Sequence, residues 1–132
     1  MKPVKQENPL GCAVACGAFI LRTTYIETLS MFTNGHEKAN TIGFICKEIV
    51  TALNLAGFKF EYKYIKSAIR NKIYQSNTIV FLRRSKKYPY GHYLVRTSNK
   101  WMDSWINFPN EKIKAGYRTR LPEKPIYAIS PI

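Results

Sequence analysis

The sequence is poor in residues that bind metals or form disulfides. It contains three Cys and two His, with no closely spaced pairs of ligands. An odd number of cysteines without a framework of four or more favours thiol chemistry in a reducing compartment over disulfide bonds. The same scarcity argues against a structural zinc site. We therefore expect neither a metal nor another cofactor.

Long apolar runs, repeats and linkers are also absent. The apolar run from Cys12 to Leu21 is too short to cross a membrane, and no signal peptide precedes it. We therefore expect a cytoplasmic protein without a transmembrane segment. Hydrophobic residues make up 45% of the sequence, which is enough for a folded core. Residues 1–132 are predicted to form a single domain.

Acidic residues are scarce as well: eight Asp and Glu stand against 21 Lys and Arg, a formal net charge of +13. Such a surface attracts nucleic acid, an anionic lipid surface or an acidic protein, and charge alone does not choose among them. A solvated basic surface without a dedicated partner is an equal alternative. The basic loop over residues 83–91 is either solvated or the rim of a cleft that attracts an acidic partner. Its tyrosines could stack on bases, but no nucleic-acid-binding motif accompanies them.

Hydrophobic periodicity predicts helices in the first half of the chain. A helix with one break is expected over residues 12–30, and turn residues predict a loop over residues 34–38. Thr41 is expected to cap an amphipathic helix that ends at Gly57. Cys46 lies within that helix and is expected to be an inert buried thiol.

From residue 58 the period changes from 3.6 to 2, which predicts strands. A strand with one buried face is expected over Phe58–Tyr64, followed by a short helix that ends near Tyr74. The strands expected after it cover residues 78–82, which form a central strand, and residues 92–97, 100–106 and 125–130, the last of which closes the sheet. The predicted class is α+β, with N-terminal helices packed on a mostly antiparallel sheet.

Cys12 stands where a polar loop with Pro9 and Gly11 meets the first predicted helix. Unpaired backbone N–H groups and the positive end of the helix dipole favour a thiolate at such a position. A thiolate placed there is a nucleophile that needs a base. Cys16 lies one turn further along and is expected to face the core.

His92 and Asp103 lie on two predicted strands joined by Ser98–Asn99. A two-residue turn there pairs His92 with Trp105, so that His92 and Asp103 become diagonal neighbours on one face. The carboxylate can then fix the imidazole tautomer and stabilise the imidazolium. Trp105 is expected to shield this hydrogen bond from water. A register shift of one residue would place the two groups on opposite faces.

This arrangement resembles the papain-like cysteine peptidases. Within that group it is most similar to the bacteriocin-processing peptidases, which remove double-glycine leaders, and to their stand-alone relatives. The matching residues are Gln6, Cys12 and Cys16 in the opening motif, Gly91–Val95 in the histidine strand and Trp101–Asp103 in the aspartate strand. The resemblance spans residues 6 to 108. It implies a papain-like fold and a thiol hydrolase that cleaves a peptide or isopeptide bond.

By this resemblance Cys12 is the nucleophile, His92 the general base and acid, and Asp103 the residue that orients the imidazole. Gln6 would donate its side-chain amide to the oxyanion, beside the backbone N–H of Cys12. The substrate implied is a protein or peptide, with an acidic one favoured if the basic loop lines the cleft.

Three departures from the family pattern leave the substrate open. Ala13 follows the nucleophile where the family usually has Gly, Gly17 replaces the common Leu, and the interval from His92 to Asp103 is short. The leader-processing enzymes are also usually joined to a membrane transporter, which is not expected here. The same residues could deamidate glutamine or transfer an acyl group. A non-enzymatic basic module that binds nucleic acid is the alternative from another class.

Overall fold

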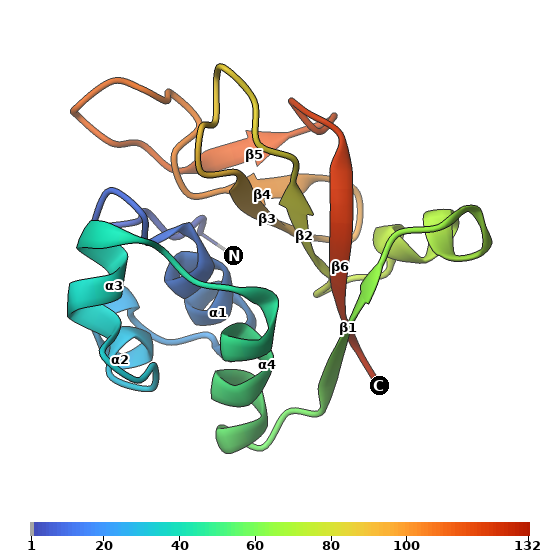
Figure 1. Ribbon diagram of the computed structural model, residues 1–132, viewed down its shortest axis with the longest axis horizontal. Coiled ribbons are helices and arrows are strands. Elements are labelled where there is room, and N and C mark those ends of the chain that lie inside the picture. Colours follow the sequence, from blue (N-terminus) through green and yellow to red (C-terminus); the bar gives the residue numbers. More distant parts are fainter. Residues whose placement is uncertain (1) are drawn as a thin grey trace.

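Over residues 2–132, which a computed structural model describes, four α-helices precede a six-stranded sheet (Figure 1). The helices are α1 (Cys12–Leu21), α2 (Tyr25–Leu29), α3 (Gly35–Thr41) and α4 (Cys46–Leu55). The strands are β1 (Phe60–Tyr64), β2 (Ile79–Leu82), β3 (His92–Arg96), β4 (Trp101–Asp103), β5 (Gly116–Arg118) and β6 (Pro125–Pro131), with a 3-10 helix η1 (Ser67–Tyr74) after β1. This order confirms the predicted α+β class.

The strands follow the order β1-β6-β2-β3-β4-β5, and each neighbouring pair is antiparallel. β2 is central, as predicted. β6 was expected to close the sheet but lies inside it, because it pairs with both β1 and β2. β1 therefore takes an edge, where Phe60 is buried but Tyr62 and Tyr64 are exposed. The sequence predicts a buried face along the whole strand, but only Phe60, the first residue of β1, is buried.

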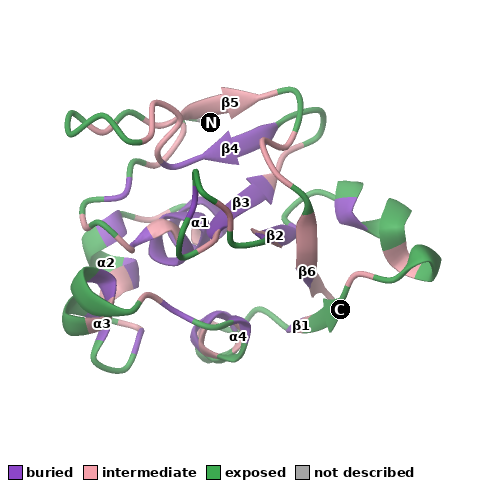
Figure 2. Ribbon diagram, turned by 45° about the horizontal axis from the view of Figure 1, so that its top comes forward, coloured by how far each residue is buried: buried purple, intermediate pink, exposed green. Residues whose placement is uncertain are grey.

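Helix α1 is buried on all sides, which Figure 2 shows as a purple helix beside β3. Every residue from 13 to 20 is buried, because α1 packs against β3, α2 and α4. The Ala, Gly and Cys side chains of this segment allow that close packing. Cys16 is fully buried, as expected.

Two predicted helix boundaries are wrong. Turn residues around Asn34 predict a loop, and Asn34 does adopt the left-handed conformation (φ 53°), but the chain then enters helix α3. Thr41 was expected to cap the following helix and is instead the last residue of α3. The cap of α4 comes from Glu48, whose carboxylate accepts a hydrogen bond from the backbone N–H of Ile45 at 2.9 Å.

Candidate active site

Cys12 is the first residue of α1, with Gly11 at the N-cap. A Cβ at Gly11 would lie 1.9 Å from the hydroxyl oxygen of Tyr25, which donates a hydrogen bond to Asn8 Oδ1 at 2.7 Å. Glycine therefore allows Tyr25 to hold the loop that leads to the cysteine. The first helical bond joins the N–H of Ala15 to the carbonyl of Gly11. The N–H of Cys12 thus has no acceptor within the helix and points out of its N-terminus.

His92 begins β3 and Asp103 ends β4, and the two are joined by a hydrogen bond. The observed pairs Val95↔Met102 and Arg96↔Trp101 confirm the predicted register of the two strands. His92 Nε2 lies 2.7 Å from Asp103 Oδ1, and the side chains are 5% and 0% exposed. The two groups therefore meet in a site that excludes water.

The neighbours of this pair favour its charged form. Burial alone would lower the pKa of His92, but hydrogen bonds to Asp103 and Cys12 outweigh it and raise the pKa to about 9. Burial alone would raise the pKa of Asp103, but the hydrogen bond and charge of His92, together with a hydrogen bond from Arg118, lower it to about 2. Because Nε2 faces Asp103, Nδ1 is the ring nitrogen left for the Cys12 thiol.

The ring stacked on the imidazole is that of Tyr88, whereas Trp105 was predicted to cover the hydrogen bond between His92 and Asp103. The two rings of Tyr88 and His92 are stacked, with centroids 4.9 Å apart and planes 2° from parallel. Trp105 lies in the turn after β4, since the strand ends at Asp103, and its indole N–H donates to the carbonyl of Asn110 at 2.9 Å. Its backbone N–H donates to Asp103 Oδ1 at 3.0 Å. Tyr88 lies in the basic loop, and its stacking on the imidazole was not predicted.

Arg118 is a residue of the site that sequence analysis missed. Its Nε donates to Asp103 Oδ2 at 2.7 Å, and its Nη2 donates to the carbonyl of Ile106 at 3.1 Å. It comes from β5, which pairs with β4 and places Arg118 opposite Trp101. A strand of three residues shows no alternation long enough to predict it.

Gln6 is buried beside the end of β4. Its Oε1 accepts a hydrogen bond from Ser104 Oγ at 2.8 Å, although the two residues are 98 positions apart. Its Nε2 donates to the carbonyls of Asn8 at 2.9 Å and Pro9 at 3.1 Å. The structure thus brings Gln6 to the same pocket as Cys12, with its amide donors engaged by its own loop. Ser104, which follows Asp103 directly in the sequence, was not among the predicted site residues.

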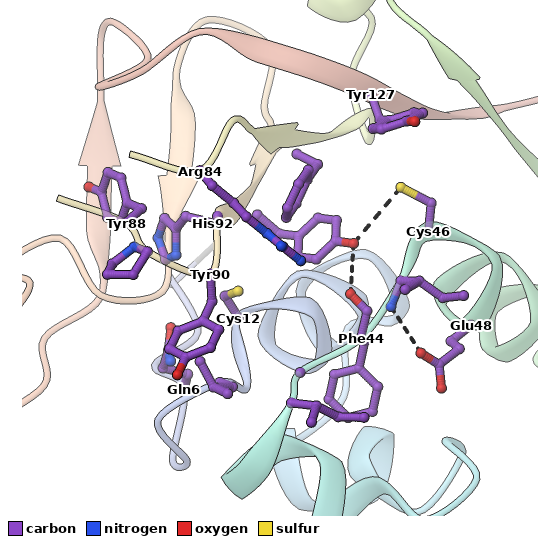
Figure 3. A pocket seen from close by; sticks show the side chains of 18 of the residues that line it. Gln6, Cys12, Phe44, Cys46, Glu48, Arg84, Tyr88, Tyr90, His92 and Tyr127 are labelled. Atoms are coloured by element: carbon purple, nitrogen blue, oxygen red, sulfur yellow. Dashed lines mark hydrogen bonds between the residues drawn. The ribbon is translucent and has the colours of Figure 1, made fainter. Parts of the chain in front are cut away.

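Cys12, His92 and Gln6 line one pocket of about 570 Å³. Figure 3 shows Cys12 beside His92, and Cys46 on the opposite wall. The apolar side chains of the pocket come from the loop before α1, from the segment before α4 and from the sheet and its loops; they include Leu10, Ile42, Phe44, Ile45, Tyr62, Phe81, Tyr90 and Tyr127. The Sγ of Cys46 lies 3.8 Å from the Tyr93 hydroxyl, and burial raises the pKa of this thiol. Cys46 is therefore a buried, protonated thiol, as predicted.

A helical N-terminal layer with a cysteine at a helix start, packed on an antiparallel sheet that carries a His–Asp pair, defines a papain-like α+β fold. The structure is similar to the crystal structure of the peptidase domain of Streptococcus ComA, a bi-functional ABC transporter involved in a quorum-sensing pathway. The TM-score is 0.57 at 21% identity, and the match covers 98% of this chain and 96% of that chain. The predicted resemblance to this peptidase group is confirmed at the level of the fold.

No family model matches the sequence, and a search of curated proteins finds no match either. Within residues 2–132, no helix is long and apolar enough to cross a membrane. In the same part of the chain, no group of three or more His, Cys, Asp or Glu side chains is placed to hold a metal ion.

Proposed function

We propose that this chain is a thiol hydrolase that cleaves a peptide or isopeptide bond with Cys12, His92 and Asp103. The observation that carries the proposal is the buried 2.7 Å hydrogen bond between His92 and Asp103, beside a cysteine at the first position of a helix. The fold is that of a peptidase domain, which supports the same chemistry. We also infer that residues 1–132 act as a single domain, because β1 and β6, from the middle and the end of the chain, pair in one sheet.

In the proposed reaction the Cys12 thiolate attacks the carbonyl carbon of the scissile bond. The His92 imidazolium gives its Nδ1 proton to the leaving amine, and a thioester to Cys12 remains. His92 then takes a proton from water, whose oxygen attacks the thioester carbonyl; the C–S bond breaks, and the carboxylic acid leaves while the Cys12 thiolate and the His92 imidazolium are restored. Asp103 keeps its negative charge throughout and holds the imidazole by Nε2.

The oxyanion formed in each step is proposed to bind between the backbone N–H of Cys12 and the side-chain amide of Gln6. Ser104 holds the amide by its oxygen, which leaves Nε2 facing the loop and the pocket. We expect the oxyanion to replace the longer of the two loop bonds, the one to Pro9 at 3.1 Å. Loss of one such donor typically costs roughly 2.7–4 kcal/mol of transition-state stabilisation.

We propose further that the substrate is an acidic peptide or protein. The charged residues that line the pocket, among those described, are Lys47, Glu48, Arg84 and His92. Glu48 forms an ion pair with Lys38, which offsets its charge. Arg84 lies over the pocket in Figure 3, and no carboxylate in the described part of the chain pairs with it. The pocket therefore presents an excess of positive charge to a bound peptide.

Alkylation by iodoacetamide at about pH 6 tests the proposed chemistry, with mass spectrometry to assign the labelled thiol. We expect Cys12 to react at least roughly tenfold faster than Cys46, because burial raises the pKa of Cys46 and keeps it protonated. His92→Ala should lower the rate at Cys12 and leave the rate at Cys46 unchanged, since the imidazolium partner of the Cys12 thiolate is lost. Equal rates at Cys12 and Cys46 in the unchanged protein would contradict the proposal.

A further inference from the structure

The Asp103 carboxylate has two cationic partners, one on each oxygen. Oδ1 accepts hydrogen bonds from His92 Nε2 at 2.7 Å and from the Trp105 N–H at 3.0 Å. Oδ2 accepts one from Arg118 Nε at 2.7 Å. The guanidinium is itself held in place, because its Nη2 donates to the carbonyl of Ile106 at 3.1 Å. Asp103 is 0% exposed and the Arg118 side chain only 21%, so water screens this ion pair little.

The charges of this cluster cancel in pairs. The Cys12 thiolate offsets the His92 imidazolium, and Arg118 offsets Asp103. Without Arg118 the site would hold two anions, the buried Asp103 carboxylate and the Cys12 thiolate, against one cation. An uncompensated buried charge is costly, and the excess negative charge would favour protonation of the His92–Cys12 pair.

The other groups that face the cluster do not supply this charge. Cys16 from α1 and Tyr88 from the loop before β3 both act on the site, and burial raises the pKa of each, so both are neutral at neutral pH. Glu123, from the turn before β6, is paired with Arg83 at 2.9 Å. Lys87 Nζ lies over the Tyr88 ring, 5.4 Å from its centroid, and forms no ion pair with the Asp103 carboxylate among the described residues.

We propose that Arg118 is a positioning residue that neutralises Asp103, so that Cys12 and His92 exchange their proton in a site without net charge. The proposal rests on the function proposed above. The three-residue strand β5 delivers this arginine: Trp101 and Asp103 share one face of β4, and Arg118 lies opposite Trp101 on the same face. β5 thereby links the outer edge of the sheet to the catalytic pair.

The rate of Cys12 alkylation by iodoacetamide, measured against pH, tests this role. Arg118→Gln should shift the midpoints of both the acid and the alkaline limb of the profile to higher pH by about 0.5 to 1 unit, because excess negative charge favours protonation. Asp103→Asn should shift the midpoints of both limbs to lower pH. The double variant Asp103→Asn/Arg118→Gln, in which both charges are gone, should return the limbs to within about 0.3 pH unit of the unchanged protein.

Two further variants distinguish the loss of the positive charge at position 118 from a structural effect of the substitution. Arg118→Lys keeps the positive charge and should keep the limbs in place. Arg120→Gln removes the same charge from an exposed position two residues along the chain and should leave the profile unchanged. Circular dichroism and thermal unfolding of each variant show which of them fold. If Arg118→Gln alone does not fold, the limbs of Asp103→Asn and of the double variant still decide, since the proposal requires them to differ.

The outcomes are distinguishable. A rate that falls equally at every pH in Arg118→Gln, with unmoved limbs, would mean that Arg118 only holds β5, and the inference would be overturned. Identical limbs in Asp103→Asn and the double variant would overturn it as well. If Cys12 of the unchanged protein reacts no faster than Cys46, the proposed function itself fails, whatever Arg118 does.

Discussion

At the scale of single residues, the three cysteines show how surroundings separate chemically identical groups. Cys16 is fully buried in α1, and burial raises the pKa of its thiol well above the usual value. Burial also raises the pKa of Cys46, although that residue lines the pocket. Cys12 alone among the three is half-exposed and lies beside His92. A nucleophile requires this combination of access and a proton acceptor.

The stacked ring of Tyr88 gives a prediction at this scale. Tyr88→Ala should lower the rate of Cys12 alkylation roughly tenfold, because water would reach the His92–Asp103 hydrogen bond and the imidazole would lose its support. Tyr88→Phe keeps the ring and should retain nearly the full rate. Stopped-flow or quench labelling at about pH 7 measures both. If the Ala and Phe variants react alike, the ring does not support the imidazole.

At the scale of elements, the entry to β3 places His92. Gly91 has φ +74°, and a Cβ there would lie 2.2 Å from the Phe81 ring and 2.9 Å from the Leu82 carbonyl oxygen. The chain therefore turns tightly against β2 immediately before the histidine. Only glycine meets both requirements, which are a left-handed backbone and the close approach of a neighbouring strand.

The chain offers a matched control for this turn, since Gly57 also has positive φ (+93°) but has no atom within 4 Å of a Cβ. Gly57→Ala should cost only backbone strain, about 1–2 kcal/mol of unfolding free energy. Gly91→Ala should cost about 1–3 kcal/mol more, because overpacking against Phe81 is added. Urea unfolding followed by tryptophan fluorescence measures both. Equal losses would show that the contact with β2 does not constrain the turn.

At the scale of the whole molecule, the net charge is +13, and Lys47 and Arg84 bring part of the positive charge to the pocket of the proposed active site. Arg84 lines the pocket without an ion-pair partner among residues 2–132, whereas its neighbour Arg83 forms an ion pair with Glu123. This difference connects the composition of the chain to the substrate class proposed above. It also separates that proposal from the alternative of a nucleic-acid-binding module, in which the basic surface would act without Cys12.

A pair of electrophilic peptide probes that differ only in Glu against Gln tests the role of this charge. The Glu probe should label Cys12 about three- to tenfold faster at low salt, and the advantage should shrink as salt screens the charges. Arg84→Gln should remove most of the advantage, whereas Arg83→Gln should not. Equal labelling by both probes, together with salt-dependent retention on nucleic acid that Cys12→Ala leaves unchanged, would favour the binding module.

The sequence by itself determined the fold class and the pairing of His92 with Asp103. Alternation with period 2 and the short turn at Ser98–Asn99 set the hairpin register, and this register places His92 and Asp103 on one face. The change from helical to strand periodicity likewise predicted the α+β class. These features can be predicted from the sequence because they depend on residues only a few positions apart, over which hydrophobic periodicity and turn preferences operate.

The tertiary structure decided the surroundings of that pair. The contacts of Arg118 with Asp103, Tyr88 with His92 and Gln6 with Ser104 each bring separate segments together. The insertion of β6 between β1 and β2 has the same origin. No local period encodes such contacts, because they follow from the order of strands in the complete sheet and from which buried charge or ring needs a partner.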